Sequence, residues 1–427
     1  MLRNHEVNRS TKIDWRAWAV CLTASLFCFY EFVQMMMFNA IDPDLMRAFS
    51  VNATQLGQIS SAYLIANLLF MFPAGVILDR VPTKRLILIA MSLCVCGTVI
   101  FSFSHSMYEA MFGRFLTGIG GAFPFLSCLR LASRWFSAKQ MGMITGAIVT
   151  IMMLGGVAGQ TPMTYLNHLF GWRVALRLDA LLGVCFIGLI FWIVRDYPDN
   201  YPKHLIKPAQ FNRADVLKSL QLVLSNKLNW LFGVYTCLLN LPVMLLGAVW
   251  GGLFLRQVHQ FTSLQASYVT TMIFFGTLIG SPVVGWLSDS VGRRKVPMIV
   301  GAILSIVVVA VIMYWPGNDL ALMMALFFLL GFVSSTQIIS YPAIAESNAH
   351  DQAGAALGLA SVLIMGGAGF FQPLFGWLMD LDWSGKIIDG VAHYSMHNYL
   401  SGFMIFPIAF MIGLVMVLLA KETYRKV

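Results

Sequence analysis

Residues 75–85 read GVILDRVPTKR and residues 285–295 read GWLSDSVGRRK, so a glycine, an aspartate and a run of basic residues occur twice in the same order. These segments start 210 residues apart. A second pair, GGVAGQTP at 155–162 and GGAGFFQP at 366–373, starts 211 residues apart. Two independent pairs with nearly the same spacing predict an internal repeat, with two similar halves joined in tandem.

The composition is that of an integral membrane protein. Of the 427 residues, 58% are hydrophobic and 11% are charged, whereas soluble domains carry about 25% charged residues. A hydrocarbon core about 30 Å thick needs roughly 20 residues of helix. Twelve apolar segments of this length are predicted, at Trp15–Ala40, Leu56–Leu78, Arg85–Phe103, Ala110–Leu131, Met141–Leu166, Ala175–Val194, Trp230–Leu255, Leu264–Leu287, Pro297–Trp315, Leu320–Ala345, Ala353–Leu378 and Tyr399–Ala420.

Six of these spans fall in each half of the chain. The expected fold is therefore an all-α membrane protein with twelve transmembrane helices in two parallel six-helix repeats. We expect an N-terminal six-helix bundle at residues 1–194, a basic cytoplasmic linker at 195–229 and a C-terminal six-helix bundle at 230–427. The first span continues for more than 20 residues without an A-x-A-like cleavage site, so it is expected to be retained.

The net charge of +9 is distributed unevenly between the connecting loops. If both termini are cytoplasmic, 22 of the 28 Lys and Arg residues lie on the cytoplasmic side, five lie outside and Arg114 lies in the membrane. This bias follows the positive-inside rule and predicts a multi-pass protein of the cell inner membrane with both termini in the cytoplasm. Because the basic residues lie between hydrophobic helices, they do not indicate nucleic-acid binding.

Metal sites, cofactors and enzymatic catalysis are not expected. All seven cysteines fall within predicted spans, and the eight histidines lack the spacing of metal ligands. The chain contains no G-x-x-x-x-G-K-[ST] motif, and its polar residues form no recognisable pair of nucleophile and base. Any energy for active transport must then come from an ion gradient or from the solute's own gradient.

The two basic loops, RFLTGIGG at 114–121 and the glycine-rich end of the fifth span resemble the signatures of the major facilitator superfamily. The resemblance covers about Trp15 to Ala420, and it implies a secondary transporter with its solute site between the two repeats. It also implies latches that hold the outward-facing state, although the same charges have a second interpretation as signals of membrane orientation. The implied latch residues are Gly75, Asp79, Arg80, Arg85, Gly285, Asp289, Arg293 and Arg294.

Small residues are expected where helices approach closely, and Gly75 and Gly285 have this role in the resemblance. Further helix-packing positions are Gly118, Gly121, Gly155 and Gly159. The chain departs from the family at two places. Pro82 stands where the first basic loop usually has glycine, and the glycine-proline pattern of drug antiporters is incomplete in the fifth span. The second departure argues against an antiporter.

Residues 28–38, CFYEFVQMMMF, place a carboxylate inside the first span. Glu31 and Gln34 share one helical face with Phe27 and Phe38, and Tyr30 flanks this face. The resemblance implies that the first, fourth, seventh and tenth spans line the central cavity. An ionisable residue inside a membrane is a functional-site hypothesis in its own right.

Three interpretations of Glu31 remain open: a proton carrier, a static ion-pair partner of Arg114, and a structural hydrogen bond. By helical rise, Glu31 and Arg114 differ in depth by about 5–8 Å, which a long arginine side chain can bridge. We expect that they pair, or that Arg114 holds an anionic substrate. A packing role for Arg114 is the alternative.

Asn240, Gln337 and Tyr341 in the seventh and tenth spans are further candidates for the substrate or proton-coupling site. Bonding between helices is the competing interpretation for each. Arg177 and Asp179 lie early in the span Ala175–Val194, near its predicted outer end, and an interfacial role is expected for both.

The sequence thus favours a secondary active transporter that moves a small polar, carboxylate-bearing solute by proton symport. An amino acid, an organic acid or a siderophore fits this description, and the protein is expected to work as a monomer in membrane lipid. The alternative is a proton-coupled exporter of drugs or metabolites. A transporter-like sensor or a lipid flippase is a third class, and a sensor would be expected to carry an added signalling domain.

Overall fold

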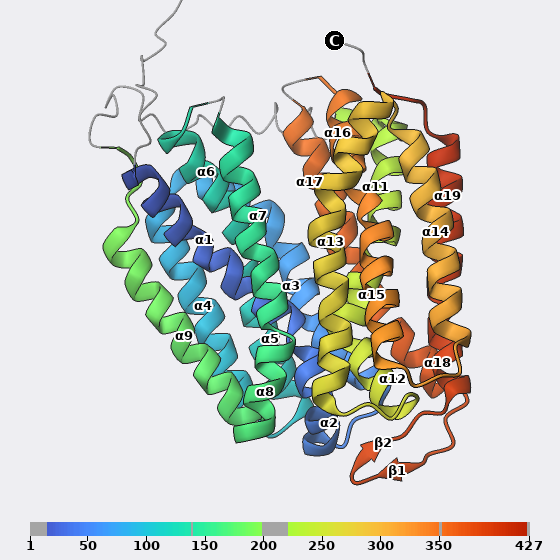
Figure 1. Ribbon diagram of the computed structural model, residues 1–427. Coiled ribbons are helices and arrows are strands. Elements are labelled where there is room, and N and C mark those ends of the chain that lie inside the picture. The colour runs from blue at the N-terminus through green and yellow to red at the C-terminus, as the bar shows by residue number, and fades with distance from the viewer. Residues whose placement is uncertain (1–14, 138–139, 199–220, 350–351, 425–427) are drawn as a thin grey trace, which may run out of the picture.

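The computed structural model describes residues 15–137, 140–198, 221–349 and 352–424, and at residues 72, 75, 76, 79 and 353 it describes the backbone alone (Figure 1). Long helices run side by side through the whole length of the molecule. Helices of the first half are α1 Trp15–Met36, α2 Phe38–Phe49, α3 Ala53–Arg80, α4 Thr83–Phe103, α5 Met107–Gly121, α6 Pro124–Trp135, α7 Met141–Ala158, α8 Thr161–Phe170 and α9 Trp172–Ile193.

The second half repeats this pattern with more irregular helices. It contains α11 Lys227–Leu239, the π-helix η3 Pro242–Trp250, α12 Gly251–Gln257, α13 Ser263–Val291, α14 Lys295–Tyr314, α15 Leu320–Ser334, the 3₁₀-helix η4 Ser335–Ile339, α16 Ser340–Glu346, α17 Ala353–Asp380, α18 Met396–Phe403 and α19 Ile405–Leu419. A two-stranded antiparallel hairpin, β1 Ile387–Ile388 and β2 Val391–Ala392, was not predicted.

The long helices of the described residues are long enough to span a membrane. Eleven helical stretches are long and apolar enough to cross a bilayer, and the remaining predicted span, Leu56–Leu78, lies within the 28 residues of α3. The predicted all-α membrane fold is confirmed, and its helices agree with twelve spans.

The internal repeat is visible in how equivalent helices begin. Asn52 caps the N-terminus of α3 and Thr262 caps that of α13, 210 residues later. Each cap forms a reciprocal capping box with a glutamine three residues on, Gln55 or Gln265. A capping box satisfies two backbone N–H groups that the first helical turn leaves unpaired. The same capping box therefore begins the second predicted span of each half.

Several predicted spans are broken near the centre of the molecule. The first span changes direction at Met37, the fourth at Ala122 and Phe123, and the fifth at Gly159 and Gln160, while η3 and η4 interrupt the seventh and tenth. Pro242 starts η3, and a proline has no N–H to donate to the preceding turn. Each break frees backbone carbonyls that need partners away from water.

The two halves are joined at one end of the molecule. We call the end that carries β1 and β2 the hairpin end, and the opposite end, where Trp15 and Tyr424 lie, the termini end. Figure 1 shows α1–α9 on one side and α11–α19 on the other, closer together at the hairpin end than at the termini end. All hydrogen bonds between the halves in the described part of the chain involve hairpin-end residues, from Asn39 to Thr54 and at Gln160 and Thr161 in the first half.

Asn39 on α2 makes the densest of these connections. Its Nδ2 donates to the carbonyls of Leu246, at 2.8 Å, and Gly247, at 2.5 Å, and its Oδ1 accepts from the N–H of Gly252 at 2.9 Å. The side chain is buried. One amide therefore pairs backbone groups of η3 and α12 in the opposite half.

Three other side chains complete what we call the hairpin-end lock, which consists of Asn39, Asp42, Gln160 and Arg256. Asp42 and Arg256 form an ion pair between α2 and α12. Gln160 Nε2 donates to the carbonyl of Met36 in its own half at 2.6 Å and to that of Gly247 in the other half at 2.7 Å. The lock thus uses carbonyls from the breaks in the first and seventh spans.

Replacing Asn39 by Ala is expected to shift the protein toward conformations that are open at the hairpin end, because the bonds to η3 and α12 are lost. Spin labels at Leu169 and Gln260, both exposed near the hairpin end, measure the separation. We expect a new population at longer distance. The exposed cysteines Cys96 and Cys185 are replaced first so that they take no label.

Asn167→Ala is the matched control for this measurement. Asn167 also lies near the hairpin end and donates to the Ala40 carbonyl and to Asp44, each at 2.7 Å, but both partners belong to its own half. An unchanged distance distribution in Asn39→Ala, or an equal change in the control, would show that Asn39 does not hold the halves together.

Candidate functional site

The polar residues predicted for the first half meet inside a ring of helices. Glu31 and Gln34 come from the end of α1, and Arg114 comes from α5. Tyr63 on α3 and Asp179 on α9 join them. At a rise of 1.5 Å per residue, Gln34 lies about 3 Å, and the other four about 7–15 Å, along their helices from the ends nearer the hairpin. Five polar side chains from four different helices are therefore brought together.

Arg114 is the centre of this group. Its side chain is 1% exposed, and its Nη1 donates to the backbone carbonyl of Gln34 at 2.7 Å. That carbonyl lies in the last turn of α1, where the break at Met37 removes the usual backbone donor. The rings of Phe38 and Tyr63 each lie 4.7 Å from the guanidinium carbon. Arg114 is thus held in place by one carbonyl and two aromatic rings.

One edge of the Arg114 guanidinium has no protein partner. Its Nε and Nη2 are buried and make no hydrogen bond. These two N–H groups point in the same direction and form the fork that binds a carboxylate with two parallel hydrogen bonds. A buried donor without a partner costs free energy, more so when it is charged. The fork is therefore the strongest candidate anion-binding group among the described residues.

Glu31 lies beside Arg114 and does not pair with it directly. The Tyr63 hydroxyl donates to the Glu31 carboxylate, and the Tyr63 ring stacks against the Arg114 guanidinium. No ion pair within 4.0 Å joins Glu31 to Arg114 in the part of the chain that the structure describes. In this conformation Tyr63 connects the two charges, and the predicted direct pair is not formed.

Gln34 connects a second acid to the group. Its Nε2 donates to Asp179, and its Oε1 accepts from the Thr98 hydroxyl at 2.9 Å. The Tyr30 hydroxyl donates to the same Thr98 oxygen at 3.4 Å. The interfacial role expected for Asp179 is wrong, because the side chain is 5% exposed and points into the bundle between α1 and α4. Arg177, two residues earlier, is exposed as expected and packs over Phe103.

Candidates in the second half form a separate pair. Gln337 Nε2 donates to Asn240 Oδ1 at 2.9 Å, which joins η4 to the end of α11. Thr236 donates to Gln337 at 3.3 Å. Tyr341 packs against the hydrophobic core. Among the described contacts, none connects these residues to Arg114 or Glu31.

The second basic loop forms a network within its own half, at the termini end. Asp289 Oδ1 lies 2.6 Å from Arg294 Nη1, and Glu346 Oε1 on α16 lies 2.7 Å from Arg294 Nη2. Burial opposes the charge, but Glu346 and Asp289 hold the pKa of Arg294 above its usual range. Arg293 is exposed. In this conformation the predicted latch residue Asp289 bonds to Arg294, and Arg294 bonds to Glu346 on α16; among the described contacts, neither bonds to the opposite half.

The first basic loop is described only in part. Gly75 and Asp79 are latch predictions whose side-chain surroundings lie outside the described residues, while Arg80 and Arg85 are exposed at the surface. At Gly285 the predicted close helix approach is not formed in this conformation, since an added Cβ would meet nothing within 4 Å. The halves lie farther apart at this end (Figure 1), and no atom of the opposite half comes close to Gly285.

Glycines of α5 and α7 do allow close approach. A Cβ on Gly118 would lie 2.9 Å from Ala66 Cβ, and one on Gly155 would lie 3.0 Å from the Cα of Phe29. At Gly121 it would meet the Tyr63 hydroxyl at 2.5 Å, and at Gly159 the Val33 carbonyl at 3.0 Å. These contacts bring α5 against α3 and α7 against α1, which sets the positions of Tyr63 and Glu31.

Several site residues gave no signal in the sequence. Tyr63 and Thr98 are ordinary members of apolar helices, and their roles follow from helices that are distant in the chain. Asn39 and Gln160 belong to helix breaks that were not predicted, and Glu346 ends α16. Of the missed residues, only Asp179 was detectable, as one of the few acids inside a predicted span.

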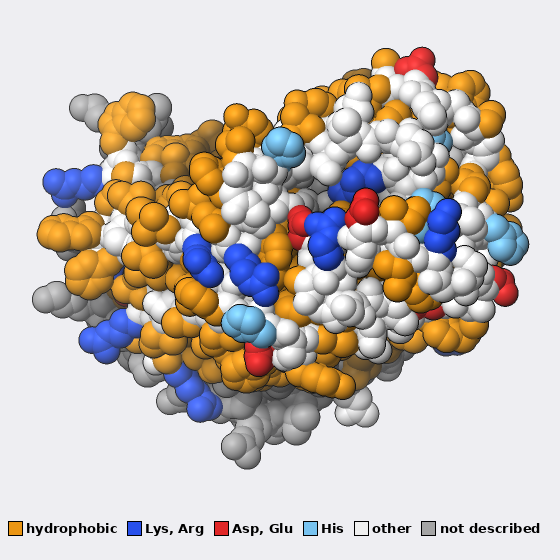
Figure 2. All heavy atoms as spheres, turned by 90° about the horizontal axis from the view of Figure 1, so that it is seen from below, with side chains coloured by type: hydrophobic (Ala, Val, Ile, Leu, Met, Phe, Trp, Pro, Cys, Tyr) orange, Lys and Arg blue, Asp and Glu red, His pale blue; other side chains and the backbone are white. Residues whose placement is uncertain are grey.

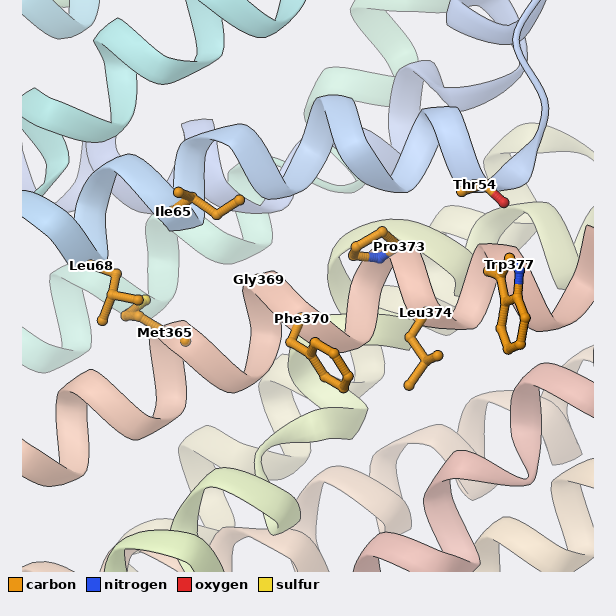
Figure 3. Close-up of a pocket in the computed structure, with 10 residues that line it drawn as sticks. Thr54, Ile65, Leu68, Met365, Gly369, Phe370, Pro373, Leu374 and Trp377 are labelled. Carbon is orange, nitrogen blue, oxygen red and sulfur yellow. The ribbon is translucent and has the colours of Figure 1, made fainter.

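The best-defined groove lies elsewhere, on the outer face between α3 and α17. It measures about 480 Å³ and is lined almost entirely by apolar side chains. Figure 3 shows Ile65 and Leu68 of α3 facing Met365, Gly369 and Phe370 of α17. Phe370 is 63% exposed. This surface has the character of a lipid-facing seam between the halves. The hydroxyl of Thr54, the one polar side chain in the described lining, donates to Asp380.

Metal ligation is not supported by the described residues, which contain no group of three or more His, Cys, Asp or Glu side chains that could hold an ion.

Comparison with known proteins places this geometry in a family. The model of the Major Facilitator Superfamily matches residues 23–266 and 236–427, which covers both repeats. The membrane sensor protein UhpC of Salmonella typhimurium is 24% identical over 80% of this chain and 79% of its own. The human lysosomal dipeptide transporter MFSD1 is 24% identical over 64% of this chain and 62% of its own. A probable hexose phosphate transport protein of Chlamydia muridarum is 24% identical over 88% and 89%.

Solved structures share the fold at low sequence identity. A bacterial homologue of the human lysosomal transporter Spinster, in an inward-facing and unoccupied conformation, superposes with a TM-score of 0.77 at 14% identity and covers 95% of this chain and 98% of its own. A D-xylose–proton symporter gives 0.71 at 16% identity, over 93% and 97%. With the family match over both repeats, these likenesses identify a multi-pass transport protein and not an enzyme: the chain belongs to the major facilitator superfamily.

Proposed function

We propose that the protein is a secondary active transporter that carries a small carboxylate-bearing solute across the inner membrane together with protons. The observation that carries this proposal is the unpartnered Nε and Nη2 fork of Arg114, which is fully buried beside Glu31. A solute carboxylate fits the fork with two charge-assisted hydrogen bonds. Phe38 and Tyr63 keep the guanidinium oriented for this contact.

The relatives are named for different solutes, and the charge of this site favours a carboxylate-bearing one. One relative is named for hexose phosphate and another for dipeptides. A phosphate monoester carries about −1.5 to −2 charges at pH 7, whereas a carboxylate carries one. In the described residues, Arg114 is the one cation that contacts Tyr63 and Gln34. A single guanidinium balances a single carboxylate, as in an amino acid, a short peptide or an organic acid.

Glu31 supplies the proton coupling in this proposal. Its carboxylate shares Tyr63 with Arg114, so a change of charge at Glu31 alters the field at the fork. A proton bound at Glu31 removes a negative charge that would otherwise repel an arriving carboxylate. Binding of solute and proton at neighbouring groups favours their movement in the same direction. Asn240, Gln337 and Tyr341 are proposed to complete the solute site from the second half when the halves close around it.

Alternating access requires a second conformation in which the hairpin-end lock is broken and the termini end is closed. We propose that Asp289, Arg293, Arg294 and Gly285, with Gly75, Asp79, Arg80 and Arg85, stabilise that state. The termini end is proposed to be cytoplasmic. The hairpin end carries five of the 28 Lys and Arg residues, which supports this orientation. Figure 2 shows both basic and acidic side chains on that end. The protein is proposed to act as a monomer.

Uptake into proteoliposomes tests the proposed function. Purified protein is supplied with radiolabelled pools of amino acids, dipeptides, organic acids and iron siderophores, with and without an inward proton gradient. We expect one carboxylate-containing pool to accumulate only with the gradient. If no pool accumulates and loaded metabolites or dyes leave instead, the protein is an exporter.

The likeness to UhpC makes a sensor the second candidate, because that relative is named as a membrane sensor protein. A sensor would bind the solute and change conformation without accumulating it. Solute-dependent protection of the protein against thermal unfolding, without uptake from any pool, would favour this second function over transport.

Arg114→Lys is expected to raise the KM for uptake by about 30-fold or more, because lysine keeps the charge but cannot make the two parallel bonds. The factor corresponds to about 2 kcal/mol, the lower range for losing one partner of a buried charged pair. The maximal rate should change less. Arg177→Lys is the control, since Arg177 is exposed and outside the group. Equal KM values for both variants would exclude Arg114 from solute binding.

Glu31→Gln is expected to abolish proton-driven accumulation and to preserve exchange of preloaded labelled solute, since glutamine keeps the size and the acceptor oxygen but cannot gain or lose a proton. Counterflow in the absence of a gradient measures the exchange. Glu109→Gln, at the exposed start of α5, is the control. Loss of both activities in Glu31→Gln would instead point to a structural role.

A further inference from the structure

Among the described buried acids of the first half, Asp179 on α9 has the least compensation from a cation. The side chain is 5% exposed, and Gln34 donates to it from α1. The Tyr30 hydroxyl is also within hydrogen-bonding reach. Both partners are neutral. Glu31, by contrast, is close to the Arg114 guanidinium through their shared contact with Tyr63.

The cations around Asp179 are committed elsewhere. Arg173 donates to the carbonyl of Ser104 at 2.8 Å and lies over Trp172. Arg177 lies over Phe103 and is exposed. Arg114 directs its Nη1 to the backbone of Gln34. No ion pair within 4.0 Å involves Asp179 in the described part of the chain.

The remaining titratable groups near Asp179 do not balance its charge either. Tyr30 and Glu31 face it from α1, and Cys94 lies near Tyr30 on α4. His168 on α8, the other helix packed against α9, is exposed. An ionised carboxylate that is buried with only neutral donors costs free energy. The protonated acid has no charge and needs no neighbouring cation.

We propose that Asp179 is a second proton-binding site, so that the transport cycle carries one proton on Asp179 in addition to the one on Glu31. This inference rests on the proposed proton symport. In the present conformation Asp179 holds its proton among Gln34, Tyr30 and Thr98. When water from the cytoplasmic side reaches α9, the proton leaves the carboxyl oxygen for that water. After the hairpin end opens, the carboxylate takes up a new proton from water on the outer side, and the side chain is then buried again.

Gln34 is the positioning residue that connects this proton to the movement of the halves. It lies in the last turn of α1, three residues before the break at Met37. Immediately beyond it, the Met36 carbonyl is held by Gln160, and Asn39 is bound to η3. Opening of the hairpin-end lock therefore releases the end of α1 and moves Gln34 relative to Asp179. The same movement changes the carbonyl that positions Arg114.

Infrared spectroscopy of the full-length protein in liposomes tests the proton on Asp179 without any solute. At pH 7, the C=O stretch of protonated carboxylic acids, identified by its shift in D₂O, is expected to lose one component in Asp179→Asn. Asparagine keeps an oxygen that accepts from Gln34. The component should remain in Glu31→Gln and in Asp382→Asn, which changes an exposed acid near the hairpin end. An Asp179→Asn spectrum identical to that of the wild type in this region would overturn the proposal.

A transport assay measures the net charge that crosses the membrane in each cycle. Radiolabelled amino acid and organic acid pools are taken up under a fixed pH gradient, with and without an inside-negative potential set by K⁺ and valinomycin. Asp179→Asn should carry one proton, and therefore one positive charge, fewer in each cycle. The ratio of solute accumulation with the potential to accumulation without it should then be lower than in the wild type by roughly 50-fold per 100 mV. Uptake driven by the pH gradient alone should persist in this variant, and Asp382→Asn should match the wild type.

The results of the two experiments test this inference separately from the proposed function. If the wild type accumulates solute and Asp179→Asn responds to the potential in the same way, Asp179 carries no transported proton while symport stands. If the wild type accumulates nothing, the proposed function fails, and the infrared result still decides whether Asp179 is protonated. Should Asp179→Asn not fold, the proton-to-solute ratio of the wild type decides: two supports the inference and one overturns it.

Discussion

Backbone groups freed by helix breaks are the constraint on which this structure depends. Inside a bilayer no water is available to pair them, so each needs a partner from the protein. Gln34 and Met36, at the end of α1, give their carbonyls to Arg114 and Gln160. In the other half, η3 gives carbonyls to Asn39, Gln160 and Gln372. The hydrogen bonds that pair these carbonyls thus fix the positions of side chains from other helices.

The same pairing connects the candidate site to the contact between the halves. Glu31 and Gln34 precede the break at Met37, and Asn39 and Asp42 follow it within a few residues. The first part of this stretch faces Arg114 and Asp179, and the second part bonds to η3 and α12. A change in the hairpin-end lock is therefore transmitted to the site through fewer than four turns of helix. This continuity gives alternating access a physical path in the first half.

Around the candidate site, the described charged groups form one compensated group and one uncompensated acid. Arg114 and Glu31 share Tyr63, which keeps both buried charges near an opposite charge. Asp179 is surrounded by neutral donors. In the second half, the acids Asp289 and Glu346 are paired with Arg294 at the termini end, where salt and water reach them. In the proposed function, proton binding thus belongs to the first half, whereas the ion pairs of Arg294 lie within the second.

Sequence periodicity and composition determined the all-α membrane fold, the repeat and the candidates Glu31, Gln34 and Arg114, because hydrophobic length and the spacing of motifs are local properties of the chain. Glu31 and Gln34 share a face through helical geometry alone. Tertiary structure decided which groups meet. The bridging role of Tyr63, the burial of Asp179 and the openness around Gly285 all depend on how distant helices pack, and the partners of Asn39 depend on a π-helix 200 residues away. No local sequence pattern predicts these contacts, because each forms only when distant helices pack against one another.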